Sequence, residues 1–78
     1  MPHVAIKLFP GKTEEQKIQL AEEIRQTLLT VFKSSDESIS IAFEEVAPQD
    51  WLETVYKPEI ESKADKLYKK PGYDAYNR

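Results

Sequence analysis

The residue best placed to do chemistry in this sequence is Pro2, directly behind Met1 at the head of an apolar run. If Met1 is removed, the proline nitrogen becomes a free secondary amine, whereas the nitrogen of an internal proline is locked in an amide. An α-amino group titrates near pKa ~8, and apolar burial or a nearby cation lowers that pKa towards neutral pH, where a general base works best. Pro2 is therefore a candidate base, although many prolines at this position reflect only tolerated N-terminal processing.

His3 follows this proline and is the only histidine of the chain. It could hydrogen-bond a substrate or donate a proton, and the alternative is a solvent-facing strand residue. One histidine and no cysteine leave no plausible zinc cage and no disulfide. The acidic pairs lack histidine or cysteine companions, so neither a metal site nor paired-carboxylate catalysis is predicted at Glu14 and Glu15, Glu22 and Glu23, or Glu44 and Glu45.

The 78 residues predict a single domain over 1–78 that is marginally stable as a monomer. Without disulfides or a metal, self-association is the expected source of stability, and we expect at least a dimer. A net charge of -3 and a pI near 5.1 argue against a nucleic-acid partner. No apolar run approaches the ~18 residues of a membrane span, and the start MPHVAIKLF lacks a cleavage signal, so a cytoplasmic protein without a membrane partner is expected.

Alternating residues over 3–9 predict a first strand, which the following Pro-Gly pair ends in a turn. Thr13 and Gln16 form a capping-box pattern, which predicts the start of a long helix over 13–32. Its apolar residues recur at three- and four-residue steps and form one stripe that needs a sheet to cover it: Ile18, Ala21, Ile24, Leu28, Val31 and Phe32.

A second alternating run predicts a strand over 38–46. Strand, helix and strand in so short a span imply a right-handed parallel crossover. Because a two-stranded sheet is barely stable alone, partner strands from another subunit would extend it. Phe9 and Phe43 are interpreted as core residues rather than pocket residues.

The last third of the chain predicts helical segments over 50–57 and 58–70. Pro58 interrupts the first of them, because proline removes a helix hydrogen bond and is favoured in the first turn of a new helix. The tail 71–78 has two tyrosines and no regular pattern, so it is either loose or docked on a neighbouring subunit. The predicted fold class is α+β.

In this order, these features resemble the 4-oxalocrotonate tautomerase superfamily. The similarity runs from Pro2 to about Trp51 and rests on the proline and first strand, the turn and cap PGKTEEQK at 10–17, the long helix, and SISIAFEEV at 38–46. The segment from Trp51 and the closing KKPGY at 69–73 are similar to the bacterial phenylpyruvate-tautomerase-type subgroup. The resemblance implies a β-α-β unit whose parallel strand pair is extended into a larger sheet by dimerisation, with a homodimer favoured over a hexamer.

The resemblance implies an enzyme, a small tautomerase (isomerase) that interconverts enol and keto forms of 2-oxo acids such as phenylpyruvate. The Pro2 nitrogen would take a proton from the enol hydroxyl and return it to carbon, as general base and then general acid. No metal and no organic cofactor are implied. Two alternatives stay open: a non-catalytic dimeric ligand-binding or interaction module on the same fold, and proline-dependent hydratase, dehalogenase or decarboxylase chemistry.

The resemblance also implies substrate-binding roles for other residues. Lys12 occupies the position of a substrate-binding arginine and could meet a carboxylate, or it is a solvated turn lysine. Ser40 replaces a second arginine, which disfavours a dicarboxylate such as 2-hydroxymuconate and favours an aryl-substituted 2-oxo acid. Trp51 matches an aromatic that lines the pocket and helps lower the pKa of the proline, or it is a core tryptophan.

Overall fold

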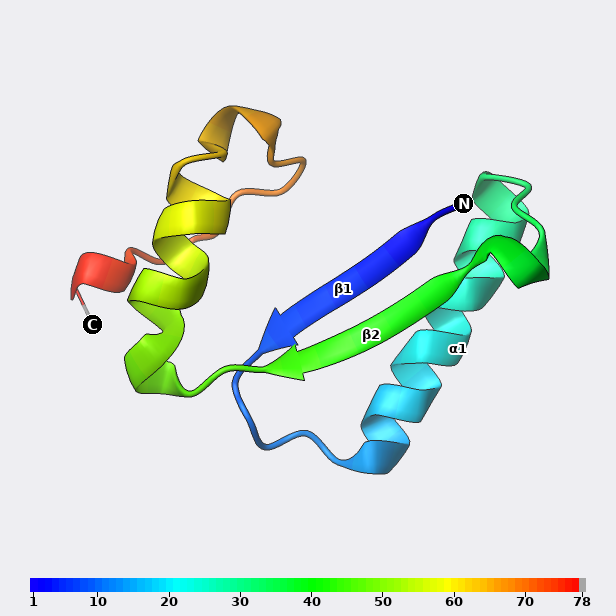
Figure 1. Ribbon diagram of the computed structural model, residues 1–78, viewed down its shortest axis with the longest axis horizontal. Helices are drawn as coiled ribbons and strands as arrows, with labels where there is room; N and C mark the ends of the chain where they lie inside the picture. The colour runs from blue at the N-terminus through cyan, green and yellow to red at the C-terminus, as the bar shows by residue number, and fades with distance from the viewer. Residues whose placement is uncertain (78) are drawn as a thin grey trace. The chain divides into compact units, whose positions relative to one another are not determined.

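The chain divides into two compact units, Met1–Glu45 and Val46–Arg78, in the computed structural model, which describes residues 1–77. The first unit consists of strand β1 (His3–Leu8), helix α1 (Glu14–Val31) and strand β2 (Ser40–Glu45). Figure 1 shows α1 leading from the end of β1 back to the start of β2, so the two strands run side by side and parallel. The predicted α+β class is confirmed.

The strand register places two different faces on this sheet. His3 pairs with Ser40, and the pairing continues without a bulge to Leu8 and Glu45. Residues of one parity are half-buried on the face towards α1: Val4, Ile6, Leu8, Ile41 and Phe43. Residues on the opposite face include exposed His3, Ala5, Ser40 and Ala42. One sheet face is therefore covered by the helix of the same unit and the other is open.

The start of α1 has the capping box that the sequence predicts. The Gln16 amide donates to Thr13 Oγ1 at 3.1 Å, and the Thr13 amide donates to Gln16 Oε1 at 2.9 Å. The preceding turn contains Gly11 at a φ of 132°, a conformation that residues with a Cβ rarely adopt. These local interactions satisfy helix-start amides and direct the chain from β1 into the helix.

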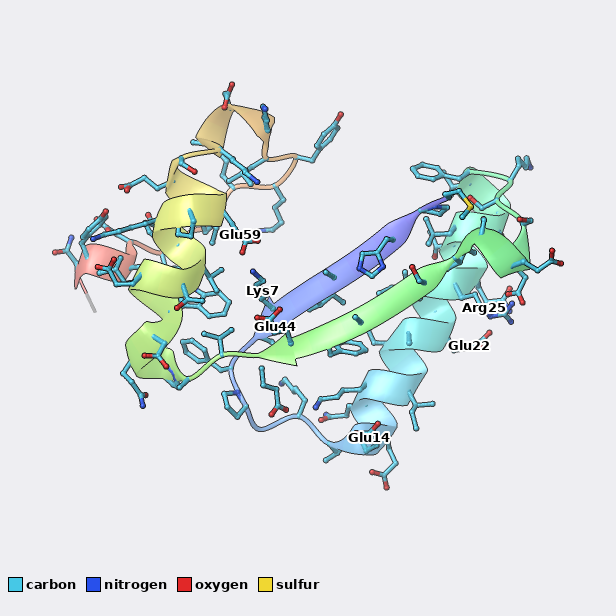
Figure 2. All side chains as sticks on the ribbon, viewed as in Figure 1. Lys7, Glu14, Glu22, Arg25, Glu44 and Glu59 are labelled. Atoms are coloured by element: carbon cyan, nitrogen blue, oxygen red, sulfur yellow. The ribbon has the colours of Figure 1, made fainter. Side chains whose placement is uncertain are left out.

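Arg25 makes two ion pairs, one within α1 and one that joins α1 to the connection before β2. Its guanidinium contacts Glu22 on the same helix at 2.8 Å and Asp36, in the short 3₁₀ turn at Asp36–Ser38, at 2.6 Å; Figure 2 labels Glu22 and Arg25 on the helix. Its hydrogen bond to Glu22, followed by that to Asp36, raises the Arg25 pKa, and the hydrogen bond from Arg25 lowers the Glu22 pKa. Because these groups are exposed, they orient the connection more than they stabilise the fold.

The apolar stripe of α1 is wider than the sheet beneath it. Leu28 and Ala21 are half-buried at its centre, whereas Ile18, Val31 and Phe32 are 63%, 65% and 68% exposed. No residue of Met1–Glu45 reaches full burial. Two strands therefore cover only the middle of a stripe that the sequence predicts as one buried surface.

In the second unit, the helix prediction around Pro58 is wrong. A single π-helix over Leu52–Glu61 runs through Pro58, and it is flanked by 3₁₀ turns at Pro48–Asp50 and Ala64–Lys66. At its end the Ser62 amide donates to the Lys57 carbonyl, five residues back, at 3.1 Å. In an α-helix the proline ring clashes with the carbonyl four residues earlier, and the wider π-turn relieves that clash.

The predicted helix 58–70 consequently ends at Glu61, with only the 3₁₀ turn at Ala64–Lys66 beyond it. The apolar face expected for this helix buries too little surface to stabilise it, because Ala64 and Tyr68 are exposed. A short helix without an apolar face to bury is marginal in water. The tail contains a 3₁₀ turn at Ala75–Asn77, and Arg78 lies outside the described residues. Over 1–77, no helix combines the length and apolar character needed to cross a bilayer.

Replacing Lys33 with glycine should stabilise the first unit. Lys33 follows α1 at a φ of 56°, and the next amide, on Ser34, donates to the Leu28 carbonyl at 3.3 Å. Glycine adopts this left-handed conformation without Cβ strain, so Lys33→Gly should add about 1 kcal/mol and about 4–8 °C to the thermal midpoint. Lys33→Ala keeps the Cβ and is the control for loss of the charge. Equal midpoints for the two variants would contradict this account.

Candidate functional site

Pro2 lies immediately before β1 and is held by the neighbouring strand. Its carbonyl accepts a hydrogen bond from the Ser40 amide at 3.2 Å, and the residue is half-buried. Met1 precedes it and is fully exposed, so the Pro2 nitrogen is here part of an amide. The backbone of the candidate base is thus tied to the start of both strands, while Met1, the residue that would have to be removed, is exposed.

His3 and Ser40 are brought together by the register. They lie opposite each other, and His3 Nδ1 shares a hydrogen bond of 2.7 Å with Ser40 Oγ. Both side chains are on the open face of the sheet, whereas Pro2 has the parity of the helix-covered face. Ser40 therefore contacts the segment from Pro2 to His3 twice, once through its amide and once through its hydroxyl.

Lys12 lies beside a pocket on the other end of the unit. The pocket has a volume of about 270 Å³, and it is lined by Lys12, Gln16 and Lys17 together with apolar residues of both strands and α1: Ile6, Leu8, Leu20 and Phe43. Lys17 is ion-paired with Glu45 at 2.7 Å. A lysine such as Lys12 at the edge of an apolar surface suits a carboxylate with an apolar body. Phe43, which the sequence predicted as a core residue, lines this pocket. The signal in the sequence was its alternation with Ile41, which places both side chains on the sheet face towards α1.

One copy of this unit cannot bring Pro2 and Lys12 to the same small molecule. Pro2 precedes β1 and Lys12 follows it, and the strand spans His3–Leu8. At about 3.3 Å per residue, the strand separates its two ends by roughly 15–20 Å, which is longer than a small organic acid. The geometry leaves two arrangements, one in which Lys12 serves a site completed by another copy and one in which it has no catalytic role.

A second pocket, of about 380 Å³, lies between α1 and β2 and is lined by none of the residues to which the sequence assigned a catalytic or substrate-binding role. Glu14, Lys17 and Phe43 contribute to its wall. Lys17 Nζ contacts Glu45 at 2.7 Å, and this hydrogen bond raises the Lys17 pKa. That lysine is therefore already engaged by a carboxylate. Within residues 1–77, no three His, Cys, Asp or Glu side chains gather as ligands for a metal ion.

Trp51 belongs to the second unit, at the start of its π-helix, and is half-buried. Its Nε1–H donates to the Tyr73 hydroxyl at 2.9 Å. The Tyr73 ring in turn contacts the Tyr56 ring, with centroids 5.8 Å apart and an interplanar angle of 47°. The sequence left the tail either loose or docked on a neighbouring subunit; it instead contacts an aromatic residue of its own chain.

Tyr76 completes this aromatic cluster. Its ring meets Tyr56 edge-on at 5.8 Å and 89°, and its hydroxyl donates to Glu61 Oε1 at 2.7 Å. The hydrogen bond to Glu61 favours the protonated hydroxyl and, with burial as a smaller cause, raises the pKa of Tyr76 to about 12. Sequence reasoning missed the cluster because its partners are far apart in the chain. The only signal was the presence of two tyrosines in an otherwise polar tail.

Known proteins match most of the chain. A family model described as "Tautomerase enzyme" matches residues 2–55. Tautomerase PptA of Pectobacterium carotovorum is 46% identical over 74 residues, covering 94% of this chain and 97% of that protein. A probable tautomerase of Xylella fastidiosa is 37% identical over 73 residues, covering 94% and 89%.

A solved structure shares the fold. The crystal structure of YwhB, a homologue of 4-oxalocrotonate tautomerase, superposes with a TM-score of 0.58 at 32% sequence identity. The match covers 60% of this chain and 77% of that one.

The Tyr76–Glu61 hydrogen bond predicts a specific alkaline titration. A pKa raised to about 12 means that this contact contributes to stability below the ordinary tyrosine pKa of ~10 and is lost as the pH rises through about 12. Absorbance titration of phenolate should therefore lack a component near pH 12 in Tyr76→Phe. In Glu61→Gln, which keeps the hydroxyl, the same component should move towards the ordinary value. An unmodified chain whose titration has no component near pH 12 would contradict the assignment.

Proposed function

Since this chain belongs to the tautomerase family, in the 4-oxalocrotonate tautomerase superfamily, we propose that it interconverts the enol and keto forms of 2-oxo acids. It is an isomerase by that membership. Phenylpyruvate is the representative substrate, and Pro2, freed by removal of Met1, is the general base and acid. The observation that carries the proposal is that Pro2 immediately precedes β1 and that the match to the family model begins at Pro2.

The proposed reaction consists of two proton transfers. The unprotonated Pro2 nitrogen takes the proton of the enol hydroxyl, and the electron pair of that O–H bond forms the carbonyl. The C=C electrons then take a proton from the proline ammonium to form the C–H bond, which regenerates the amine. No electron leaves the substrate, so the reaction needs no redox cofactor. The Ser40 amide, 3.2 Å from the Pro2 carbonyl, keeps the base in place.

The charges near the candidate residues support a monocarboxylate substrate with an apolar group. Ser40 stands where a second cation would be needed for a dicarboxylate, and it is paired with His3 at 2.7 Å. Lys12 supplies one cation beside an apolar pocket. We also propose that Trp51 supplies an aromatic wall for the substrate, the role that the family resemblance implies. An aryl 2-oxo acid satisfies these conditions.

We place the complete site between two copies of the chain. Exposed Ile18, Val31 and Phe32 flank the covered part of α1, and burying them would supply the hydrophobic free energy that the unit lacks. A second copy would also bring its Lys12 to the Pro2 end of the first, which the length of β1 forbids within one copy. A homodimer is therefore the proposed active form.

The first test is the activity of the protein without Met1, verified by intact mass. It should convert the enol of phenylpyruvate faster than buffer, and Pro2→Ala should lower the rate by roughly 10²-fold, the range of general-base contributions, without abolishing it because a primary amine remains. Pro10→Ala, in the exposed turn after β1, is the matched control and should keep the rate. Absence of activity across several enol acids would refute the tautomerase proposal and favour a binding module.

The second test asks whether Pro2 and Lys12 act from different copies. Lys12→Ala should lower kcat/KM about tenfold, through loss of a charge-assisted contact. When it is unfolded, mixed equally with Pro2→Ala and refolded, hybrid dimers should each contain one intact site and restore about a quarter of the native rate. Pro2→Ala mixed with the double variant Pro2→Ala, Lys12→Ala is the control and should recover nothing. No recovery in the first mixture would contradict a shared site.

A further inference from the structure

The KKPGY segment at 69–73 ends on Tyr73, a residue that the proposed proton transfers do not use. Its hydroxyl oxygen accepts the only N–H of the Trp51 side chain at 2.9 Å, across 22 positions of sequence. Both residues belong to the second unit. The end of this segment is therefore attached to the aromatic side chain that the proposed function assigns to the substrate pocket.

Tyr73 is itself held in place from the other side. Its ring lies 5.8 Å from that of Tyr56, which projects from the π-helix at Leu52–Glu61. Tyr56 also meets Tyr76 edge-on, and Tyr76 is anchored to Glu61 on the same helix by its 2.7 Å hydrogen bond. The tail is thus attached to the helix at two aromatic contacts and one charged hydrogen bond. A tail fastened in this way offers the indole a fixed acceptor.

The pairing has a direct consequence for what Trp51 can present to a ligand. An indole has one polar group, its N–H, and aromatic rings interact with each other in preferred offset or edge-on arrangements. With the N–H engaged by Tyr73, rotation of the ring costs a hydrogen bond. The remaining edge and faces of the indole are apolar and have a defined orientation.

We propose that Tyr73 is a positioning residue for Trp51, and that the tail thereby sets how strongly the site binds the aryl part of its substrate. The inference rests on the proposed function, because that proposal places Trp51 in the pocket. In this role Tyr73 acts through the indole. Loss of its hydroxyl should weaken binding of aryl acids and leave the proton transfers unchanged.

The first experiment measures the indole itself. Trp51 is the only tryptophan of the chain, so the fluorescence of the protein reports on the surroundings of this one indole, including its contact with Tyr73. Tyr73→Phe keeps the ring that packs on Tyr56 and removes only the acceptor. Its Trp51 emission should shift to longer wavelength and its anisotropy should fall, as the N–H turns to water. Tyr68→Phe is the matched control, because the Tyr68 side chain is fully exposed, and its emission and anisotropy should equal those of the native chain.

The second experiment measures binding and turnover. Quenching of Trp51 by the unreactive acid 3-phenylpropanoate should give a Kd about two- to tenfold higher in Tyr73→Phe, the change that one neutral hydrogen bond supports. KM for the enol of phenylpyruvate should rise by a similar factor with kcat unchanged. The Trp51→Phe variant has no indole N–H to donate to the Tyr73 hydroxyl. Adding Tyr73→Phe to it should therefore leave KM equal to that of Trp51→Phe alone.

Each result separates this inference from the function on which it rests. Unchanged emission, or a changed emission with unchanged Kd and KM, would overturn the positioning role while the tautomerase remained active. An equal fall of kcat in both backgrounds would also overturn it, since the effect would not pass through Trp51. A chain with no tautomerase activity but weaker aryl-acid binding in Tyr73→Phe would refute the proposed function and support the positioning role.

Discussion

The parallel register of β1 and β2 is the constraint on which the rest of the structure depends. It places Ser40 opposite His3 and its amide on the Pro2 carbonyl, so the candidate base is tied to both strands at once. The same register runs the full length of β1 and sends Lys12 to the far end of the unit. Fixing the base and separating it from the cation are therefore two results of one hydrogen-bonded ladder.

The second unit has no sheet, so other contacts must hold it together. Its π-helix and tail are joined by aromatic contacts between Tyr56, Tyr73 and Tyr76, and by the hydroxyl of Tyr73 on Trp51. Val55 and Ala75, one from the helix and one from the tail, are among the few buried side chains. A small amount of apolar burial and directed ring contacts thus hold together a segment that lacks regular strands.

The features that the sequence predicted well are those with local causes. The alternating residues of β1 and the capping box of Thr13 and Gln16 involve neighbours in the chain, so their pattern can be read directly. Pro58 was misinterpreted because the rule applied to it holds for α-helices and the chain forms a π-helix there. The link from Trp51 to Tyr73 could not be predicted, since it depends on how the tail folds back. Family resemblance pointed to Lys12, and the strand predicted between Pro2 and Lys12 already indicated that the two residues lie at opposite ends of it.

The uncovered flanks of α1 link the stability of this protein to its concentration. Because no residue of Met1–Glu45 is fully buried, the unit gains limited hydrophobic free energy on its own, and covering Ile18, Val31 and Phe32 would add to it. In the proposed dimer, folding and association become one equilibrium that follows mass action. Dilution would then lower the thermal midpoint and the specific activity together, and the level of expression would regulate catalysis without any effector.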